Sequence, residues 1–458
     1  MLFESRLTAK KARLLESNFL RGVNGRKFFQ LKNIFHSRIG KNKRYFEQMI
    51  SSFDLLLEAE KALLPIFSGI DTQVKKNIKK VLTSFRERRV STQHFSSVSG
   101  YGHDDLGRET LDRVFADVMN AEAAAVRVQF VSGTHAIACC LFGVLRPGDE
   151  MLAVAGAPYD TLEEVIGTRG STHGSLGEFN IQYRQLDLTS EGEINWEALT
   201  TAVTAKTRLV LIQRSCGYSW RKSLSIEDIE RIVQIVKQQN LNTVCFVDNC
   251  YGEFIDTVEP TAVGVDLMAG SLIKNPGGTI VTAGGYVAGK ADLVELAACR
   301  LTAPGIGSSG GATFNQNRLL YQGLFLAPQM VGEAIKGTHL IAYVFDRLGY
   351  RVNPDPRSPR RDTIQSIQFG SPEKLIAFCR AIQQHSPIDS YVVPVPAEMP
   401  GYESKLVMAG GTFIDGSTSE FSADGPLREP YIAFCQGGTH WTHIAIAIEA
   451  AIEELARC

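Results

Sequence analysis

The stretch RLVLIQRSCGYSWRKSLSIEDIERIVQIVKQQNLNTVCFVD, residues 208–248, holds two strand-length apolar runs that are separated by a helical pattern. The runs are 208–213 and 243–248, and between them isoleucine and valine recur every three or four positions over 226–239. A strand, a helix and a second strand in this order are typical of a parallel sheet covered by helices on both faces.

The same alternation continues on both sides of this stretch. Strand-length runs occur at 125–131 and 150–155, and Ser225 with Asp228 forms a capping pair at the start of the helical pattern. We therefore expect an α/β fold with a mainly parallel central sheet. The expected segments are a basic extension (1–48), two N-terminal helices (49–95), a large domain (96–335) and a smaller C-terminal α/β domain (336–458) closed by a helix at 442–456.

Charge is distributed unevenly along the 458 residues. The net charge is −1, but residues 1–44 hold 12 Lys and Arg and only two acidic residues, Glu4 and Glu16. The near-neutral total gives no electrostatic argument for a nucleic-acid or membrane partner, and no apolar run approaches the ~18 residues of a membrane span. We expect 1–48 to be a disordered tail or sequence upstream of a start at Met49; a targeting segment and a nucleic-acid-binding arm are the alternatives.

The nine cysteines form no CxxC pair, and their number is odd. Several lie in apolar runs, such as Cys245 within 244–247, where cysteine behaves as a small buried hydrophobe. This pattern indicates reduced thiols, so we expect a cytoplasmic protein without a disulfide framework.

The first motif that carries chemistry is SGTHA at 132–136, which follows the apolar run 126–131 and opens a helix at 136–145. Free N–H groups and the positive end of the helix dipole at such a turn favour an anion, above all a phosphate group. The same residues also serve as an ordinary helix cap, so the motif alone is weak.

The second motif is FVDNCY at 246–251, in which Asp248 ends a strand. Ligands bind at the carboxyl ends of the strands in a parallel sheet. A carboxylate there is able to pair with a protonated ring nitrogen. An isolated aspartate at a strand end is, however, more often a helix cap.

The third motif is SLIKNPGG at 271–278, where Lys274 follows a strand-like segment and precedes a glycine-rich turn. Burial at this place disfavours the ammonium form, which suits an amine that acts as nucleophile and base. Ser271 would add a hydroxyl to a bound phosphate. Taken singly, a lysine at a strand end is usually a surface residue.

The order and spacing of the three motifs favour the functional interpretation. Asp248 comes about 115 residues after the phosphate turn, and Lys274 comes 26 residues after Asp248. This arrangement resembles that of pyridoxal-5′-phosphate (PLP) enzymes of fold type I, the aspartate-aminotransferase-like fold. The chain also resembles, over about 50–450, the methionine γ-lyase-like or aluminium-resistance protein family, which is related to the enzymes of cysteine and methionine metabolism. The matching blocks are YGHDDLGRET (101–110), VSGTHAI (131–137), SLIKNPGG (271–278) and ADGPLREP (423–430).

The resemblance implies a role for each matching residue. As catalytic residues, Lys274 would carry PLP covalently and move protons, Asp248 would pair with the ring nitrogen, and Tyr159 would stack on the ring. The phosphate would be held by Ser132, Gly133, Thr134 and Ser271, and by Tyr101 and Arg108 of a neighbouring subunit. The arginine that binds the substrate carboxylate has no clean match. The candidates are Arg428 and Arg214, and for each of them a structural ion pair is the equal alternative.

The implied function is a PLP-dependent carbon–sulfur lyase. It would catalyse β- or γ-elimination on a sulfur-containing amino acid such as methionine, cystathionine or cysteine, as a homodimer or homotetramer. Two alternatives stay open: a PLP-dependent aminotransferase, and a protein that binds PLP in stress or aluminium tolerance without lyase activity.

Two further patterns are weak. Gly305-x-Gly307-x-x-Gly310 fits a dinucleotide fingerprint but follows Ala-Pro rather than a strand, so we expect a loop. His440 and His443 have no carboxylate at ligand spacing, so no metal site is expected.

Overall fold

The structure is a computed structural model. It describes residues 43–399, 402, 404–417 and 419–458, with side chains from 52 onward. The predicted extension, 1–48, therefore lies outside the described residues except for 43–48, which belong to helix α3 (Lys43–Glu87). Residues 55–458 form one compact unit, and the arrangement described below is that of this unit.

A seven-stranded sheet forms the larger half of the unit, in the order β1-β7-β6-β5-β4-β2-β3. β7 runs antiparallel to both of its neighbours, whereas β6, β5, β4, β2 and β3 are parallel. The predicted α/β fold with a mainly parallel central sheet is confirmed. The strands are β1 (Ala123–Arg127), β2 (Glu150–Ala153), β3 (Gln182–Gln185), β4 (Thr207–Gln213), β5 (Val244–Asp248), β6 (Leu267–Ser271) and β7 (Gly285–Gly289).

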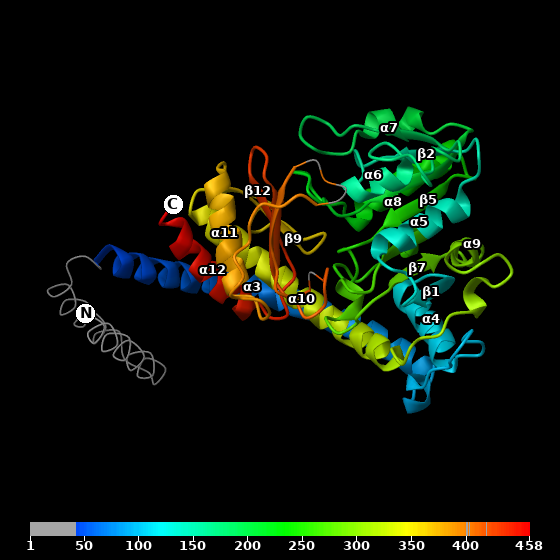
Figure 1. Cartoon of the computed structure of the whole chain (residues 1–458), viewed down its shortest axis with the longest axis horizontal. Helices are drawn as coiled ribbons and strands as arrows, with labels where there is room; N and C mark the ends of the chain where they lie inside the picture. Colours follow the sequence, from blue (N-terminus) through cyan, green and yellow to red (C-terminus); the bar gives the residue numbers. More distant parts are fainter. Residues whose placement is uncertain (1–42, 400–401, 403, 418) are drawn as a thin grey trace. The chain divides into compact units, whose positions relative to one another are not determined.

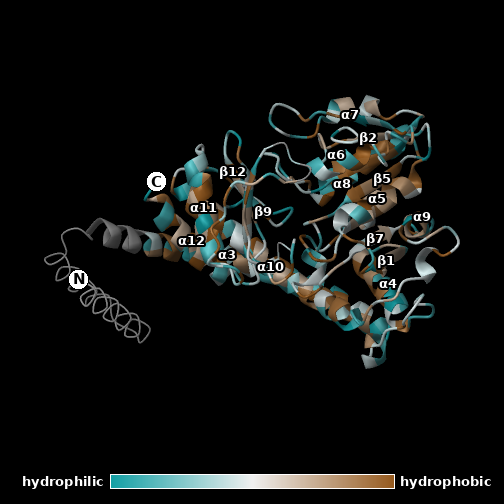
Figure 2. Cartoon of the chain, in the orientation of Figure 1, coloured by the Kyte–Doolittle hydropathy of each residue, from teal (hydrophilic) through white to brown (hydrophobic). Residues whose placement is uncertain are grey.

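Both faces of this sheet are covered by helices, because its strands are apolar on both sides. In β4, Leu209 and Leu211 pack into one hydrophobic core, and Val210 and Ile212 pack into the other. Figure 1 shows the helices on either side of the strands, and Figure 2 shows hydrophobic residues concentrated in the strands and in α5. The first core is completed by α5 (Gly133–Val144), α6 (Asp160–Ile166) and α9 (Ala291–Leu301), and the second by α4 (Leu106–Met119), α7 (Trp196–Ala202) and α8 (Ile226–Gln239).

Helix α8 has the bounds that the sequence predicts, and its first turn is closed by the predicted cap. Ser225 Oγ accepts a hydrogen bond from the N–H of Asp228 at 3.1 Å, and the Asp228 carboxylate accepts one from the N–H of Ser225 at 2.9 Å. Such a cap stabilises a helix by about 1 kcal/mol.

A five-stranded antiparallel sheet forms the smaller half, in the order β10-β11-β12-β9-β8. The long helix α10 contacts the 3₁₀ turn η3 (Asn275–Gly277) and α4 of the larger half as well as β9, β8 and α12 of the smaller half (Figure 1). The strands are β8 (Arg351–Asn353), β9 (Ile364–Gln368), β10 (Leu406–Ala409), β11 (Ser422–Pro426) and β12 (Ile432–Gln436), and the helices are α10 (Asn317–Arg347), α11 (Pro372–Gln384) and α12 (Trp441–Leu455).

Two local predictions differ from the structure. A single helix, α3, with Pro65 inside it, replaces the two predicted N-terminal helices, and a 3₁₀ turn (Thr92–Phe95) follows it. The loss of one N–H at proline is tolerated because Leu63, Phe67 and Ile70, on both sides of it, are buried. Helix α5 begins at Gly133, three residues earlier than predicted, because Ser132 is its N-cap.

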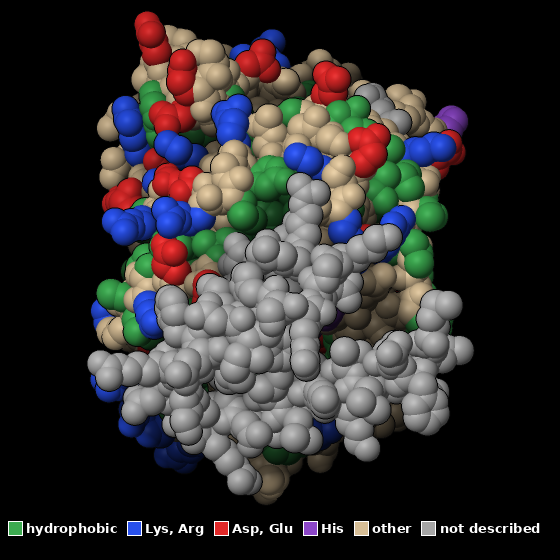
Figure 3. Space-filling model, turned by 90° about the vertical axis from the view of Figure 1, so that its left-hand side faces the viewer, with side chains coloured by type: hydrophobic (Ala, Val, Ile, Leu, Met, Phe, Trp, Pro, Cys, Tyr) green, Lys and Arg blue, Asp and Glu red, His purple; other side chains and the backbone are tan. Residues whose placement is uncertain are grey.

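On the part of the face in Figure 3 that described residues occupy, lysine and arginine are interspersed with aspartate and glutamate. Among the described residues, no helix combines the length and the apolar character that crossing a membrane requires.

Candidate active site

Two neighbouring parallel strands bring a carboxylate and an amine together at their carboxyl ends. β5 ends at Asp248, which is buried, and Lys274 follows the end of β6 by three residues. Lys274 Nζ lies 4.0 Å from the centroid of the Tyr251 ring, and its charge acts on Asp248. The predicted pair therefore shares one site at the edge where α/β sheets bind ligands.

The protonation of Lys274 differs from the sequence-based expectation. Burial alone lowers the pKa of this ammonium, but Tyr251, Cys250 and Asp248 outweigh burial and raise the pKa above its usual value. Burial therefore acts in the direction that the sequence predicts, and the neighbouring groups reverse the net shift. The lysine keeps its proton because acceptors surround it.

Asp248 is held in place by the backbone that follows it. The N–H of Cys250 donates to Asp248 Oδ1 at 3.1 Å. Burial raises the pKa of Asp248, while this hydrogen bond and the Lys274 charge oppose the increase. A buried carboxylate of this kind is stabilised further by any cation placed before it, such as a protonated ring nitrogen.

The turn that begins α5 packs on the end of β6 and beside Cys250, which follows β5. Ser132 Oγ accepts a hydrogen bond from the N–H of His135 at 3.1 Å, whereas the N–H groups of Gly133 and Thr134 make no hydrogen bond within the described part of the chain. Ser271, at the end of β6, is buried against Gly133. Two free N–H groups at the positive end of a 12-residue helix, with hydroxyls beside them, form an anion cradle.

A side chain at Gly133 would close this cradle. A methyl group there would lie 3.1 Å from Ser271 Cβ and 3.2 Å from Cys250 Sγ, so the neighbours would have to move. We expect Gly133→Ala to weaken PLP binding about 10-fold, which is ~1.4 kcal/mol. Titration of the visible absorbance with PLP measures this change. Gly69→Ala is the matched control, because nothing lies within 4 Å of the added methyl group. Equal PLP affinities of the two variants would contradict the assignment of the Gly133 turn as the phosphate site.

Tyr159 lies over the cradle. Its hydroxyl is 2.9 Å from Thr134 Oγ1, and its N–H donates to Gln213 Oε1 at 3.0 Å. Burial, with the Asp248 and Cys250 charges, raises the pKa of Tyr159 well above its usual value, so the hydroxyl is neutral. The predicted neighbours of a bound ring are thus assembled on one side of Lys274.

The two residues predicted to reach a neighbouring subunit differ in exposure. Tyr101 is 82% exposed. Arg108 is completely buried, and its guanidinium donates to the carbonyls of Gly102, Ser309 and Gly311. Arg108 therefore joins two loops of its own chain, and the structure does not bring it to the cluster.

Neither arginine predicted for the substrate carboxylate lies free in the cluster. Arg214 is completely buried and donates to Asn249 Oδ1, to the Gly252 carbonyl and to Asp256 Oδ2 at 2.8–3.0 Å. For Arg214 the structure favours the structural ion pair over the substrate role, because its terminal donors are used to hold a loop. Arg428 is exposed in the turn between β11 and β12.

The structure adds residues that the sequence did not assign. Three tyrosines and one aspartate interact electrostatically with one another or with Lys274. They are Tyr218, Tyr251, Tyr402 and Asp424. Two of them lie inside motifs already singled out, since Tyr251 ends FVDNCY and Asp424 lies in ADGPLREP. Tyr402 and Tyr218 come from loops, where periodicity gives no signal.

Glu253 is a buried carboxyl behind the site. Tyr286 Oη donates to Glu253 Oε1 at 2.8 Å, and Oε2 has no partner among the described residues. Burial raises the pKa of Glu253 to about 8. The side chain is therefore protonated at neutral pH.

This protonation predicts a specific pH dependence of stability. Between the usual glutamate pKa of about 4.3 and the raised value of about 8, the folded chain holds a proton that the unfolded chain has lost, so stability falls as pH rises. We expect the stability difference between wild type and Glu253→Gln to fall by about 1.4 kcal/mol per pH unit in this window. Urea unfolding at several pH values measures it. Glu178→Gln, at an exposed position, is the control; a difference that does not vary with pH would contradict the assignment.

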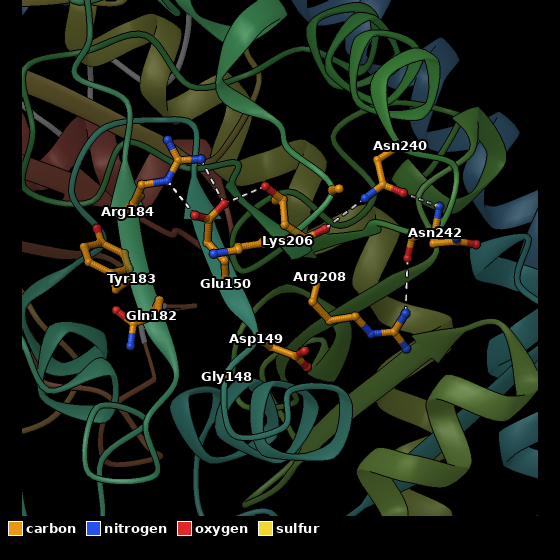
Figure 4. Close-up of a pocket in the computed structure, with 12 residues that line it drawn as sticks. Gly148, Asp149, Glu150, Gln182, Tyr183, Arg184, Lys206, Arg208, Asn240 and Asn242 are labelled. Atoms are coloured by element: carbon orange, nitrogen blue, oxygen red, sulfur yellow. Dashed lines mark hydrogen bonds and ion pairs between the residues drawn. The ribbon is translucent and has the colours of Figure 1, made fainter.

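A separate hollow of about 610 Å³ lies at the other edge of the sheet, where β2, β3 and β4 begin. Figure 4 shows Arg184 facing Glu150 there, and the two pair at 2.8 Å. This hollow contains none of the motif residues, because the beginnings and ends of parallel strands lie at opposite edges. Among the described residues, no group of three or more His, Cys, Asp and Glu side chains is placed to hold a metal ion.

The residues at the carboxyl ends of β5 and β6 and at the start of α5 fit PLP. The Gly133 cradle suits its phosphate, Asp248 suits its ring nitrogen, and Lys274 suits its aldehyde, and the three meet at one place because α5 packs on β6 and β6 pairs with β5. The close packing of Gly133 against Ser271 and Cys250, which leaves no room for a side chain, is the structural feature that most directly supports the fit.

Comparison with known proteins gives matches over most of the chain. The sequence profile described as methionine gamma-lyase matches residues 52–456. The protein YnbB of Bacillus subtilis is 49% identical over 400 residues, which are 87% of this chain and 95% of that protein. L-methionine gamma-lyase of Pseudomonas putida is 25% identical over 229 residues, 49% of this chain and 52% of that enzyme.

The solved structures include a carbon-sulfur lyase involved in aluminum resistance from Clostridium novyi. It is 47% identical to this chain, with a TM-score of 0.85, and the match covers 91% of this chain and 99% of that one. A likeness at this identity and coverage extends to the whole arrangement of both sheets.

Proposed function

Because the chain belongs to the PLP-dependent methionine gamma-lyase family, we propose that it is a carbon–sulfur lyase that releases a thiol from a sulfur-containing amino acid. The observation that carries this proposal is the meeting of Lys274, Asp248 and the Gly133 turn at one edge of the sheet. A buried amine, a buried carboxylate and an anion cradle are the three groups that PLP chemistry requires.

Each residue of the site has a task in this reaction. PLP, when bound, supplies an electron sink for negative charge on the carbon next to the substrate amine. Lys274 would hold the aldehyde of the cofactor, and its amine would take the proton from that carbon. Asp248 stabilises a proton on the nitrogen that it faces, and Gly133, Thr134 and Ser271 hold the phosphate by their N–H and hydroxyl groups.

We also propose that the working unit is a homodimer or homotetramer. Tyr101 exposes 82% of its surface in a block shared with the family, which suits a residue that a second subunit covers. Light scattering of the purified protein measures the mass, and a monomer would contradict this part of the proposal.

The test of the lyase proposal is a product assay with L-methionine, L-cystathionine and L-cysteine. A lyase releases thiol, ammonia and a keto acid in equal amounts. An aminotransferase leaves the amino group on the cofactor and releases no thiol. Bound PLP with no product from any of the three substrates would contradict the lyase proposal and favour a PLP-binding role in stress or aluminium tolerance.

A further inference from the structure

Asp424 is a buried carboxyl that the chemistry above does not use. It lies in β11 of the smaller sheet and is 5% exposed. Gln436 Nε2 donates to its Oδ2 at 3.1 Å, whereas Oδ1 is buried and no well-aligned hydrogen bond reaches it from the described residues. An unpartnered buried oxygen is costly unless a ligand completes it.

This carboxyl lies beside the site. Asp424 is paired with Phe434 across β11 and β12, and the Tyr218 ring packs on Phe434 with ring centroids 5.2 Å apart. Tyr251, over which Lys274 Nζ lies, packs against the same cluster.

Lys274 acts on Asp424 electrostatically, and so do the two tyrosines Tyr218 and Tyr402, whose ring centroids are 5.7 Å apart. The titratable groups that interact with Asp424 are Lys274, Tyr218, Tyr251, Tyr402, Cys379 and Cys435. Lys274 is the cationic residue among these groups. The positive charge that acts on Asp424 therefore belongs to the same amine that would bind the cofactor.

The arginines near the site do not compensate for Asp424. Arg214 is engaged as described above. Arg221, whose charge acts on Asp248, donates to the carbonyls of Lys222, Gln213 and Ser215. Apart from Gln436 and the Tyr218 hydroxyl, the carboxyl therefore has no hydrogen-bond donor among the described residues, and no arginine matches its charge. When ionised, it attracts the ammonium end of an amino acid rather than its carboxylate.

We propose that Asp424 receives the ammonium group of the incoming amino acid and takes its proton through Oδ1; the inference rests on the proposed function and deepens it. In this step one N–H bond breaks and one O–H bond forms, so ammonium and carboxylate become neutral amine and carboxylic acid. The substrate ammonium takes the place of the Lys274 ammonium as the cation opposite Asp424. Its nitrogen then has the lone pair that a nucleophile requires.

The acidity of Asp424 suits this role. Burial raises the pKa of its carboxyl to about 7, and Tyr218, Lys274 and Gln436 oppose the increase. A base is most effective when its pKa lies close to the working pH, because it is then both ionised and able to hold a proton. An aspartate with the usual pKa of about 3.9 would be a much weaker proton acceptor.

The test measures amine exchange directly. The PLP-loaded protein is mixed with L-methionine in a stopped-flow instrument, and the rate of the change in visible absorbance is followed against pH. We expect Asp424→Asn to slow this change about 100-fold near neutral pH. The rate should recover as pH rises through the pKa of the substrate ammonium, because solvent then supplies the neutral amine. Asp389→Asn, at an exposed aspartate, should match wild type.

Two results would overturn the inference: an unchanged rate at neutral pH, or a slowing that is the same at every pH, which would mean a structural role. A second readout needs no turnover. This readout is made in the Glu253→Gln background, because Glu253 also holds a proton at neutral pH. The infrared band of a protonated carboxyl should titrate near pH 7 there and be missing once Asp424→Asn is added; no such band near pH 7 would also contradict the inference. Amine exchange precedes thiol release, so failure of the lyase proposal would appear as exchange without thiol.

Discussion

Replacing Lys274 with alanine is expected to abolish the covalent cofactor and turnover together. The amine at this position is the only group in the described cluster that is placed to bond an aldehyde and then to accept the proton of the substrate carbon. Loss of a positioned acid–base group alone costs about 10²–10⁴-fold, and loss of the covalent attachment adds to it, so we expect a fall of at least about 10⁴-fold in turnover. Visible absorbance and product assays measure the two effects.

A second variant at this position separates the effect of losing the positive charge from the effect of losing the amine. Lys274→Arg keeps a cation beside Tyr251 but offers no amine, so it should be as inactive as alanine while remaining folded. Lys222→Ala, at an exposed lysine paired with Glu193, should keep full activity. An active Lys274→Ala protein with bound PLP would show that another amine carries the cofactor.

Replacing Asp248 with asparagine is expected to give the second largest effect. The side chain keeps its shape, and Asn Oδ1 is still able to accept from the N–H of Cys250, but the negative charge is lost. Without that charge a protonated ring nitrogen is no longer stabilised, so kcat should fall about 10²–10³-fold while Lys274 still holds the cofactor. Steady-state kinetics give the change in kcat, and the visible spectrum shows whether the cofactor remains.

Asp187→Asn removes a charge at an exposed position and is the matched control. Thermal melts of both variants distinguish lost chemistry from lost folding. If Asp248→Asn kept wild-type kcat with bound PLP, the carboxylate would not be the partner of the ring nitrogen.

Much of the larger half was predictable because its signals are local. The apolar positions of 226–239 and the Ser225 cap define α8, and the continuous apolar runs that define β4 and β5 are expected only where both faces of a sheet are covered. Lys274 and Asp248 were predictable from strand-end position, spacing and family resemblance, and the structure brings them together.

The remaining features depend on contacts between distant segments. The pKa of Lys274 is raised by Tyr251 and Cys250, which are neighbours only after folding. The sequence leaves a substrate role and a structural ion pair equally open for Arg214, and its contacts with Asn249 and Asp256 arise only in the folded chain. Asp424 lies in a strand of the antiparallel sheet, and no periodicity indicates that this strand faces Lys274. Such side-chain partners cannot be derived from the period of an apolar pattern.

The most direct test of the central claim locates the cofactor. The PLP-loaded protein is reduced with borohydride, digested, and its peptides are sequenced by mass spectrometry. We predict a phosphopyridoxyl group on the peptide that contains SLIKNPGG, on Lys274 and on no other lysine in stoichiometric amount. A stoichiometric modification at a different lysine, or none at all after loading with PLP, would contradict the account.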